Sequence, residues 1–137
     1  MLPDVRVGID IVPIKRIEAS LTPSPTRYLA KFLTAAEASY CQKAGGVWSL
    51  ERVAGRIAAK EAVMKVLGQG WPRISWTHIE VLPGSNGRPR VSLSGEARTL
   101  SESLGMRDLD VSITHDGGFA VAAALGAFSQ EVTSCSN

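Results

Sequence analysis

The sequence is poor in the features that mark several large classes of protein. Only two of its 137 residues are cysteines, Cys41 and Cys135, and their spacing fits neither a metal site nor a redox motif. Cysteines that serve as structural or incidental thiols are typical of a reducing compartment. No apolar run approaches the ~20 residues that span a bilayer, and no secretion signal opens the chain. We therefore expect a cytoplasmic protein that does not enter a membrane.

An excess of charge of one sign is also lacking. The chain has 15 basic and 13 acidic residues, a net charge of +2, whereas a protein that binds nucleic acid usually shows a marked basic excess. Neither common glycine-rich phosphate loop occurs, and there is no internal repeat. The length suits one domain. We expect this domain to span residues 1–127, with the polar residues 128–137 as a disordered tail.

The most informative stretch is Ser49–Gly68, which predicts a long helix. With successive residues about 100° apart, one apolar stripe contains Leu50, Val53, Ala54, Ile57, Met64 and Gly68. Glu61 falls in the middle of this stripe, and Lys65 lies at its edge. A basic ridge on another side is predicted from three residues at spacing four, Arg52, Arg56 and Lys60. Beyond the helix, Trp71 and Trp76 are expected to cover the core.

Glu61 permits two interpretations. Burying an ionised carboxylate without a partner costs several kcal/mol, so Glu61 needs a cation, a proton or water beside it. A buried acid with a neighbouring lysine suits a metal-assisted site for a phosphate-rich ligand. Glu61 and Lys65 also have the spacing of an ordinary ion pair on a helix surface. The helix alone leaves both interpretations open.

The other segments predict an α+β protein. Val5–Val12 has the alternating pattern of a strand, with Gly8 and Asp10 on one face. Gly8 makes room either for a ligand or for a close backbone contact. Asp10 is either a strand-end residue or a metal ligand. A capping box from Thr34 to Glu37 opens one of several short helices. Later elements are a hairpin of 77–82 and 90–93, a helix at 95–104, and a hairpin of 110–114 and 119–125. This order predicts a mostly antiparallel sheet packed against a long central helix and shorter helices.

Four separated motifs together resemble one family. They are Gly8-Ile-Asp10 on the first strand, Gly55–Lys65 (GRIAAKEAVMK) on the long helix, the turn Asn86–Pro89 (NGRP) and Ser112–Asp116 (SITHD). A K-E-A-x-x-K pattern alone occurs in many helices, but the four motifs in this order and spacing are specific. They resemble the 4′-phosphopantetheinyl transferases, in particular the short holo-acyl-carrier-protein synthase type, over nearly the whole chain.

This resemblance implies the 4′-phosphopantetheinyl transferase fold and the family's reaction. The 4′-phosphopantetheine arm of coenzyme A passes to a serine of apo-acyl carrier protein for fatty acid biosynthesis, giving holo-carrier protein and 3′,5′-ADP, with Mg²⁺ as cofactor. Asp10 and Glu61 match the metal-binding carboxylates, and Glu61 and Lys65 match the catalytic positions. Arg16 matches a basic position that docks the acidic carrier. Seven residues match the coenzyme A site, namely Arg56, Lys65, Asn86, Gly87, Arg88, Pro89 and His115.

The resemblance also implies a homotrimer with each active site at a subunit boundary. Three alternatives to this interpretation remain open. The carrier could belong to a polyketide or peptide synthetase, the chain could be a non-catalytic module that binds coenzyme A, or it could form a structural trimer without a ligand. The presence of Asp10, Glu61 and Lys65 together favours a catalyst.

Overall fold

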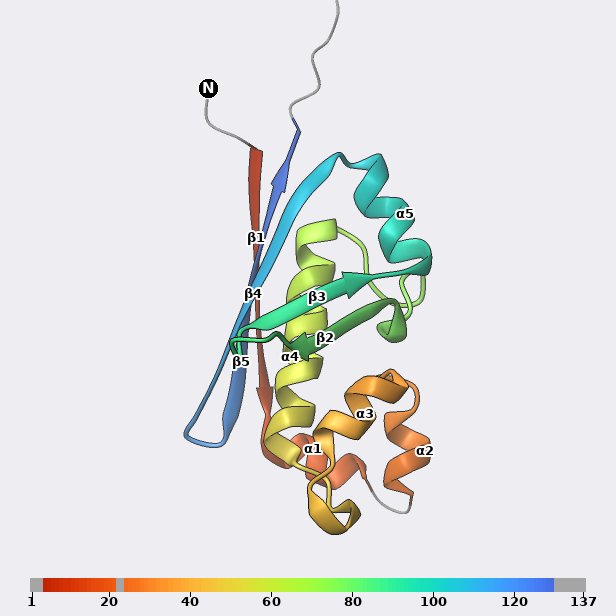
Figure 1. Ribbon diagram of the computed structural model, residues 1–137, viewed down its shortest axis with the longest axis vertical. Coiled ribbons are helices and arrows are strands. Elements are labelled where there is room, and N and C mark those ends of the chain that lie inside the picture. Colours follow the sequence, from red (N-terminus) through yellow and green to blue (C-terminus); the bar gives the residue numbers. More distant parts are fainter. Residues whose placement is uncertain (1–3, 22–23, 130–137) are drawn as a thin grey trace, which may run out of the picture.

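The computed structural model describes residues 4–21 and 24–129, and its longest helix, α4 (Leu50–Leu67), lies at the centre (Figure 1). The Ser49 side chain caps the helix by accepting a hydrogen bond from the backbone N–H of Arg52, and Gly68 ends it in the left-handed conformation with φ 74°. Serine before a helix and glycine after it favour these bounds. The predicted long helix is confirmed.

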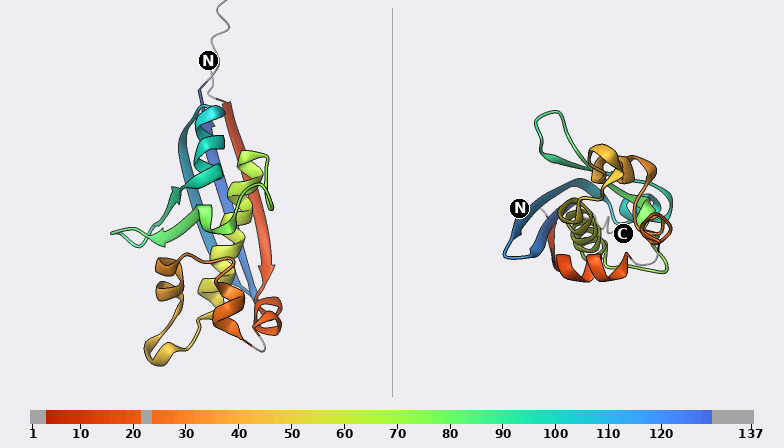
Figure 2. Two further views of the ribbon diagram at one scale, coloured as in Figure 1. Left: turned by 90° about the vertical axis from the view of Figure 1, so that its right-hand side faces the viewer. Right: turned by 90° about the horizontal axis from the view of Figure 1, so that it is seen from below.

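A three-stranded antiparallel sheet covers one side of α4. Its strands are β1 (Asp4–Pro13), β4 (Met106–Asp116) and β5 (Phe119–Phe128), in the order β1-β5-β4. The end-on view in Figure 2 shows α4 lying within the curve of this sheet. A separate antiparallel hairpin of β2 (Ile79–Pro83) and β3 (Pro89–Leu93) lies beside β4. These elements confirm the predicted α+β class.

The shorter helices gather at the two ends of α4, with α1, α2 and α3 near its first residues and α5 near its last (Figure 1). The bounds of these helices and of two short 3₁₀ turns are α1 (Ile14–Ser20), α2 (Pro25–Leu29), α3 (Ala35–Cys41), η1 (Ala44–Gly46), η2 (Trp76–His78) and α5 (Gly95–Ser103). Thr34 and Glu37 form the predicted capping box. Cys41 is a free, buried thiol, whereas Cys135 lies outside the described residues. No helix in the described part of the chain is long and apolar enough to cross a bilayer.

The last hairpin differs from the prediction. β4 includes His115 and Asp116, which the sequence places in a turn, and the next two residues, both glycines with positive φ, form that turn instead. Such a turn matches the twist of paired strands, so β4 and β5 stay paired up to Asp116 and Phe119, beyond the predicted end of the first strand at residue 114. Phe128 is the last residue of β5 and only 2% exposed, and the domain boundary at residue 127 stays a prediction. Residues 130–137 of the predicted tail lie outside the described residues.

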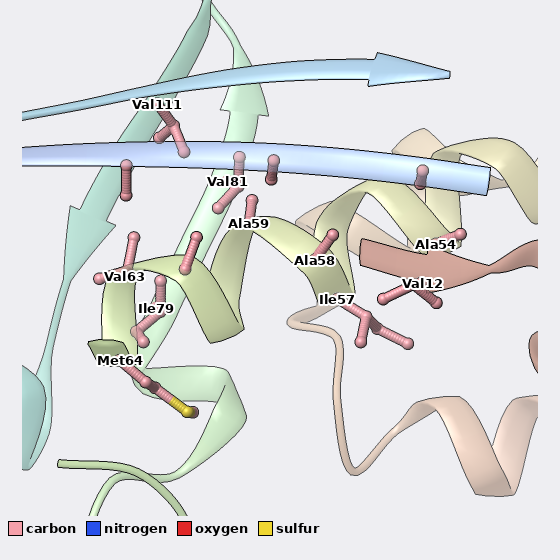
Figure 3. Packing of buried hydrophobic residues seen from close by; sticks show 14 of the residues in the cluster. Val12, Ala54, Ile57, Ala58, Ala59, Val63, Met64, Ile79, Val81 and Val111 are labelled. Carbon is pink, nitrogen blue, oxygen red and sulfur yellow. The ribbon is translucent and has the colours of Figure 1, made fainter. Parts of the chain in front are cut away.

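Small residues allow α4 to lie close to the sheet. The facing surfaces carry buried alanines from α4 and β5, some of which Figure 3 labels: Ala54, Ala58, Ala59, Ala62, Ala120, Ala122 and Ala124. A Cβ atom on Gly8 would lie 2.0 Å from the carbonyl oxygen of Ala62. Gly8 therefore serves a close contact between β1 and α4, which decides the question that the sequence left open.

The outer face of the sheet is apolar, and no segment in the described ranges covers it. The predicted alternation of β1 is confirmed, but its apolar side chains point away from α4. This outer apolar face consists of Val5, Val7, Ile9, Ile11, Phe119 and Leu125, which are 42% to 66% exposed. Val7 lies opposite Leu125 in the strand register, so the two strands form one continuous surface. Contiguous exposed apolar surface of this kind usually marks an interaction site.

Candidate active site

Asp10 and Glu61 meet at the boundary between β1 and α4. Asp10 points inward from β1, and the Glu61 side chain extends from the middle of α4 to within hydrogen-bonding reach of it. Burial, and then the neighbouring Asp10, raise the pKa of Glu61 from 4.5 to about 7, while the positive charges of Lys65 and Arg16 oppose this rise. Asp10 Oδ2 is buried and has no hydrogen-bond partner. The two carboxylates therefore converge as the sequence predicts.

Lys65 lies over this acidic pair. Its Nζ donates a hydrogen bond to the Ile9 carbonyl oxygen at 2.7 Å and lies 3.6 Å from Asp10 Oδ1. The Lys65 side chain is 56% exposed, so its charge also faces solvent. The ion pair that Lys65 makes is thus with Asp10 on β1 and not an ordinary surface pair with Glu61. This arrangement favours the interpretation of a charged site over that of a solvated helix surface.

The acidic pair fits a magnesium ion that is shared with a phosphate ligand. Mg²⁺ is commonly bound by one or two carboxylates, with water and phosphate oxygens filling its other positions. The unpartnered Asp10 oxygen and the raised pKa of Glu61 indicate that Lys65, 3.6 Å from Asp10 Oδ1, does not by itself balance both carboxylates. Within residues 4–21 and 24–129 no three His, Cys, Asp or Glu side chains form a metal cluster. Asp10 and Glu61 are the two side chains that could hold such an ion.

Arg16 lies near the acidic pair on the following helix. It is exposed on α1, and its charge acts on the Glu61 carboxyl. Lys15 is also exposed on this helix. The predicted docking position for an acidic partner therefore lies beside the two carboxylates.

A second group of predicted residues lies at the opposite edge of the sheet. In the turn between β2 and β3, the Asn86 side chain accepts a hydrogen bond from the Arg88 N–H at 3.0 Å, and the Arg88 side chain pairs with Asp110 on β4. At the end of β4, His115 Nε2 lies 2.8 Å from the Glu51 carbonyl oxygen in the first turn of α4. The turn and His115 are both exposed, or nearly so.

The structure thus divides the predicted site residues between two edges. Asp10 belongs to β1. His115 belongs to β4, and the Arg88 side chain pairs with Asp110 of β4. The strand β5 lies between β1 and β4 (Figures 1 and 2). A single chain brings Asp10, Glu61, Lys65 and Arg16 together but leaves the turn and His115 apart from them. The outer apolar face extends across β1 and β5 between the two groups.

The predicted basic ridge on α4 is wrong. Lys60 is fully buried, where its Nζ pairs with Glu37 at 2.6 Å and donates to the Trp76 carbonyl oxygen at 2.9 Å. The Arg56 guanidinium packs over the Tyr40 ring with 6% of the residue exposed, and its Nε is buried without a partner. A helical projection cannot show that α3 and β2 cover this side of α4. Arg56 remains a predicted coenzyme A contact.

Sequence reasoning missed an apolar groove beside the acidic pair. A cavity of about 530 Å³ is lined by Glu61 and Lys65 at one end, and by Met64, Trp71 and Trp76 further along. Trp71 is 65% exposed, so the prediction that it covers the core is wrong. The available signal was the continuation of the Glu61 stripe through Met64, one turn further along α4.

Comparison with known proteins gives a consistent result. Residues 6–124 match the 4′-phosphopantetheinyl transferase superfamily. A holo-[acyl-carrier-protein] synthase of Moorella thermoacetica is 43% identical over 132 residues, which cover 93% of this chain and 98% of the relative. One from Gloeobacter violaceus is 42% identical over 85% of this chain and 88% of the relative.

Solved structures agree with these sequence relatives. The Chronobacterium ammoniagenes ACPS–CoA complex has a TM-score of 0.79 at 33% identity, covering 93% of this chain and 99% of the other. Helicobacter pylori holo-[acyl-carrier-protein] synthase in complex with coenzyme A has a TM-score of 0.76 at 31% identity, covering 88% and 99%. The chain therefore belongs to the holo-[acyl-carrier-protein] synthase family of the 4′-phosphopantetheinyl transferase superfamily.

Proposed function

We propose that this protein transfers the 4′-phosphopantetheine arm of coenzyme A to a serine of apo-acyl carrier protein. The observation that carries the proposal is the convergence of Asp10 and Glu61 beneath Lys65, in a chain of this family. A non-catalytic module that only binds coenzyme A would have no use for two adjacent carboxylates with an unpartnered buried oxygen.

The reaction exchanges one phosphorus–oxygen bond for another. The serine oxygen bonds to the β-phosphorus of the coenzyme A pyrophosphate, the bond from that phosphorus to the bridging oxygen breaks, and 3′,5′-ADP leaves. Asp10 and Glu61 would hold Mg²⁺, which when bound neutralises charge on the pyrophosphate. Lys65 supplies a positive charge, or a proton, to the leaving phosphate. The serine proton passes to Glu61 or to water.

The divided site supports a homotrimer. If the outer apolar face of one copy packs against another, the β4 edge of one chain, with Arg88 and His115, can meet the β1 edge of the next. Removing this face from water would stabilise the assembly, and symmetric closed rings are common among homo-oligomers. We propose that coenzyme A lies across that boundary, with its nucleotide end near Arg56, the turn 86–89 and His115.

The partner is an acyl carrier protein that meets the exposed Arg16 on α1, where an acidic surface would be attracted. We further propose a cytoplasmic role in fatty acid biosynthesis. A polyketide or peptide-synthetase carrier is the alternative partner, because the chemistry at the serine is the same for each.

Mass spectrometry of the carrier tests the proposal. Apo-carriers from a fatty acid, a polyketide and a peptide synthetase are incubated in turn with coenzyme A, Mg²⁺ and the protein. A carrier that gains the phosphopantetheine mass, with stoichiometric 3′,5′-ADP, supports the transferase, and the fastest carrier identifies the pathway. A chelator should stop the reaction if Mg²⁺ is required. Binding of coenzyme A without formation of 3′,5′-ADP on any carrier would instead indicate a binding module.

A further inference from the structure

Glu61 lies between two residues whose positions on α4 are each fixed by buried contacts. Successive residues of a helix point about 100° apart, so the residues before and after Glu61 face different neighbours. Lys60 faces α3 and β2, whereas Ala62 faces β1. Glu61, between them, reaches Asp10. A shift of α4 at either neighbour would therefore move the Glu61 carboxylate relative to Asp10.

The first contact is made by the Lys60 ammonium, which is fully buried and fully paired. Its Nζ donates hydrogen bonds to Glu37 Oε1 at 2.6 Å, to the Trp76 carbonyl oxygen at 2.9 Å and to the Ile79 carbonyl oxygen. The other oxygen of Glu37 accepts a hydrogen bond from the Val81 N–H at 2.9 Å. Because buried polar groups are costly to leave without partners, α4 cannot turn or slide here without losing stability.

The second contact brings the backbones of β1 and α4 together. A Cβ atom on Gly8 would lie 2.0 Å from the Ala62 carbonyl oxygen and 3.1 Å from the Cβ atom of Lys65, so any larger residue would push the strand and the helix apart. Asp10 follows Gly8 by two residues and lies on the same face of β1. The spacing at Gly8 therefore also sets the distance between Asp10 and Glu61.

We propose that these two contacts act as a clamp, which holds Glu61 against Asp10 at a separation that one divalent ion can bridge. Lys60, Glu37 and Gly8 are then positioning residues, because they act through α4 and β1 and not on the substrate. This inference rests on the proposed transferase function. Close-packed interiors transmit small shifts, and residues behind metal ligands change metal affinity by about 10–100-fold when they are replaced.

Binding of Mn²⁺ tests the clamp without relying on turnover. Mn²⁺ replaces Mg²⁺, and the EPR signal of the free ion gives its Kd with coenzyme A present and no carrier. Two clamp variants are compared with the wild-type protein: Gly8→Ala, and the double variant Lys60→Met/Glu37→Gln, which leaves no unpaired buried charge. Each should raise the Kd for Mn²⁺ about tenfold or more. In transfer assays kcat should fall, because the carboxylates are displaced, while the KM for the carrier should hardly change.

Gly126→Ala is the matched control, because it adds the same methyl group between the sheet and α4. The added Cβ atom would lie 2.6 Å from Cγ1 of Val66, a side-chain atom that can rotate away, whereas at Gly8 it meets backbone. Gly126→Ala should therefore lower the Tm and leave the Kd for Mn²⁺ unchanged.

The outcomes separate the clamp from the proposed function. Circular dichroism shows which variants are folded, and if one clamp variant does not fold, the other decides. Wild-type affinity for Mn²⁺ in a folded clamp variant, or an equal loss of affinity in Gly126→Ala, would overturn the clamp and leave the transferase intact. If the wild-type protein neither binds Mn²⁺ with coenzyme A nor modifies a carrier, the proposed function itself fails.

Discussion

At the scale of single residues, the behaviour of this protein depends on charges placed where water is scarce. Glu61 stands out in the sequence because it interrupts an apolar stripe, and Asp10 because it interrupts a strand of β-branched residues. The structure puts the two side by side, and burial, together with the adjacent Asp10, makes the Glu61 carboxyl harder to ionise. Such a pair is stable only with a cation or a proton nearby, and this is the physical basis of the proposed metal site.

Glu61→Gln should abolish transfer to the carrier while leaving the fold unchanged. Glutamine keeps the size of the side chain but removes the charge that would hold Mg²⁺. Rates of 3′,5′-ADP formation measure the first effect, and circular dichroism measures the second. Substantial transfer by this variant with Mg²⁺ present would rule out the metal assignment for Glu61.

Glu61 should also make the stability of the metal-free protein depend on pH. Its pKa is raised from 4.5 to about 7 in the folded state, so the folded protein binds this proton more tightly than the unfolded chain does. The resulting stabilisation is fully present below about pH 4.5 and is lost as the pH rises through about 7. Between about pH 5 and about pH 8 the wild-type Tm, measured with a chelator, should fall more than that of Glu61→Gln. Parallel curves for the two proteins would contradict the raised pKa.

Arg16→Glu should raise the KM for the carrier about fivefold or more, since reversing a rim charge turns attraction into repulsion. The KM for coenzyme A should change much less. Arg98→Glu, an exposed charge reversal on α5, is the control and should leave both constants unchanged. An unaltered carrier KM in the Arg16 variant would show that α1 is not the docking helix.

At the scale of secondary structure elements, one buried ion pair joins three parts of the fold. Lys60 on α4 pairs with Glu37 on α3, and Glu37 also accepts a hydrogen bond from the Val81 N–H on β2 at 2.9 Å. Burial lowers the pKa of Lys60, and the negative charge of Glu37 opposes that shift. Lys60 directly precedes Glu61 in the chain and also donates a hydrogen bond to the Trp76 carbonyl oxygen. The ion pair therefore holds in place both α4 and one wall of the groove.

Lys60→Met should lower the free energy of unfolding by about 3–5 kcal/mol, because Glu37 is left buried without its cation. Glu37→Gln should also be destabilising. The double variant should lose less unfolding free energy than the sum of the two single losses, by about 1–3 kcal/mol, because the two residues are in direct contact. Urea denaturation of the four proteins measures this coupling. Strict additivity would mean that the two charges do not stabilise each other.

At the scale of the whole molecule, the sheet packs one face against its own helix and leaves the other face exposed. Ala120, Ala122 and Ala124 of β5 pack under α4, while the outer apolar face remains in contact with solvent. Because the two groups of predicted site residues lie at opposite edges of this sheet, assembly and catalysis should be linked. An isolated chain would hold only half of the proposed site.

Mixed assemblies should therefore recover activity that neither parent has. Glu61→Gln and the double variant Arg88→Ala/His115→Ala should each be severely impaired alone. When the two are co-expressed, about a quarter of the sites in randomly mixed rings would combine an intact half from each chain. A turnover assay on the mixed protein measures this fraction. Failure to recover activity, with subunit mixing verified by native mass spectrometry, would place the whole site within one chain.

The sequence by itself determined the long helix, its caps, the antiparallel class and the identity of the two acids, because these depend on periodicity and on local chemistry. It could not show that Lys60 is buried, that Trp71 is exposed, or that the apolar side chains of β1 face outward, because a period of two or of 3.6 gives the faces of an element and not what covers each face. Only the tertiary structure decided this. Gly8 shows the reason: its meaning depends on the Ala62 carbonyl, which is distant in the chain but would lie 2.0 Å from any added Cβ.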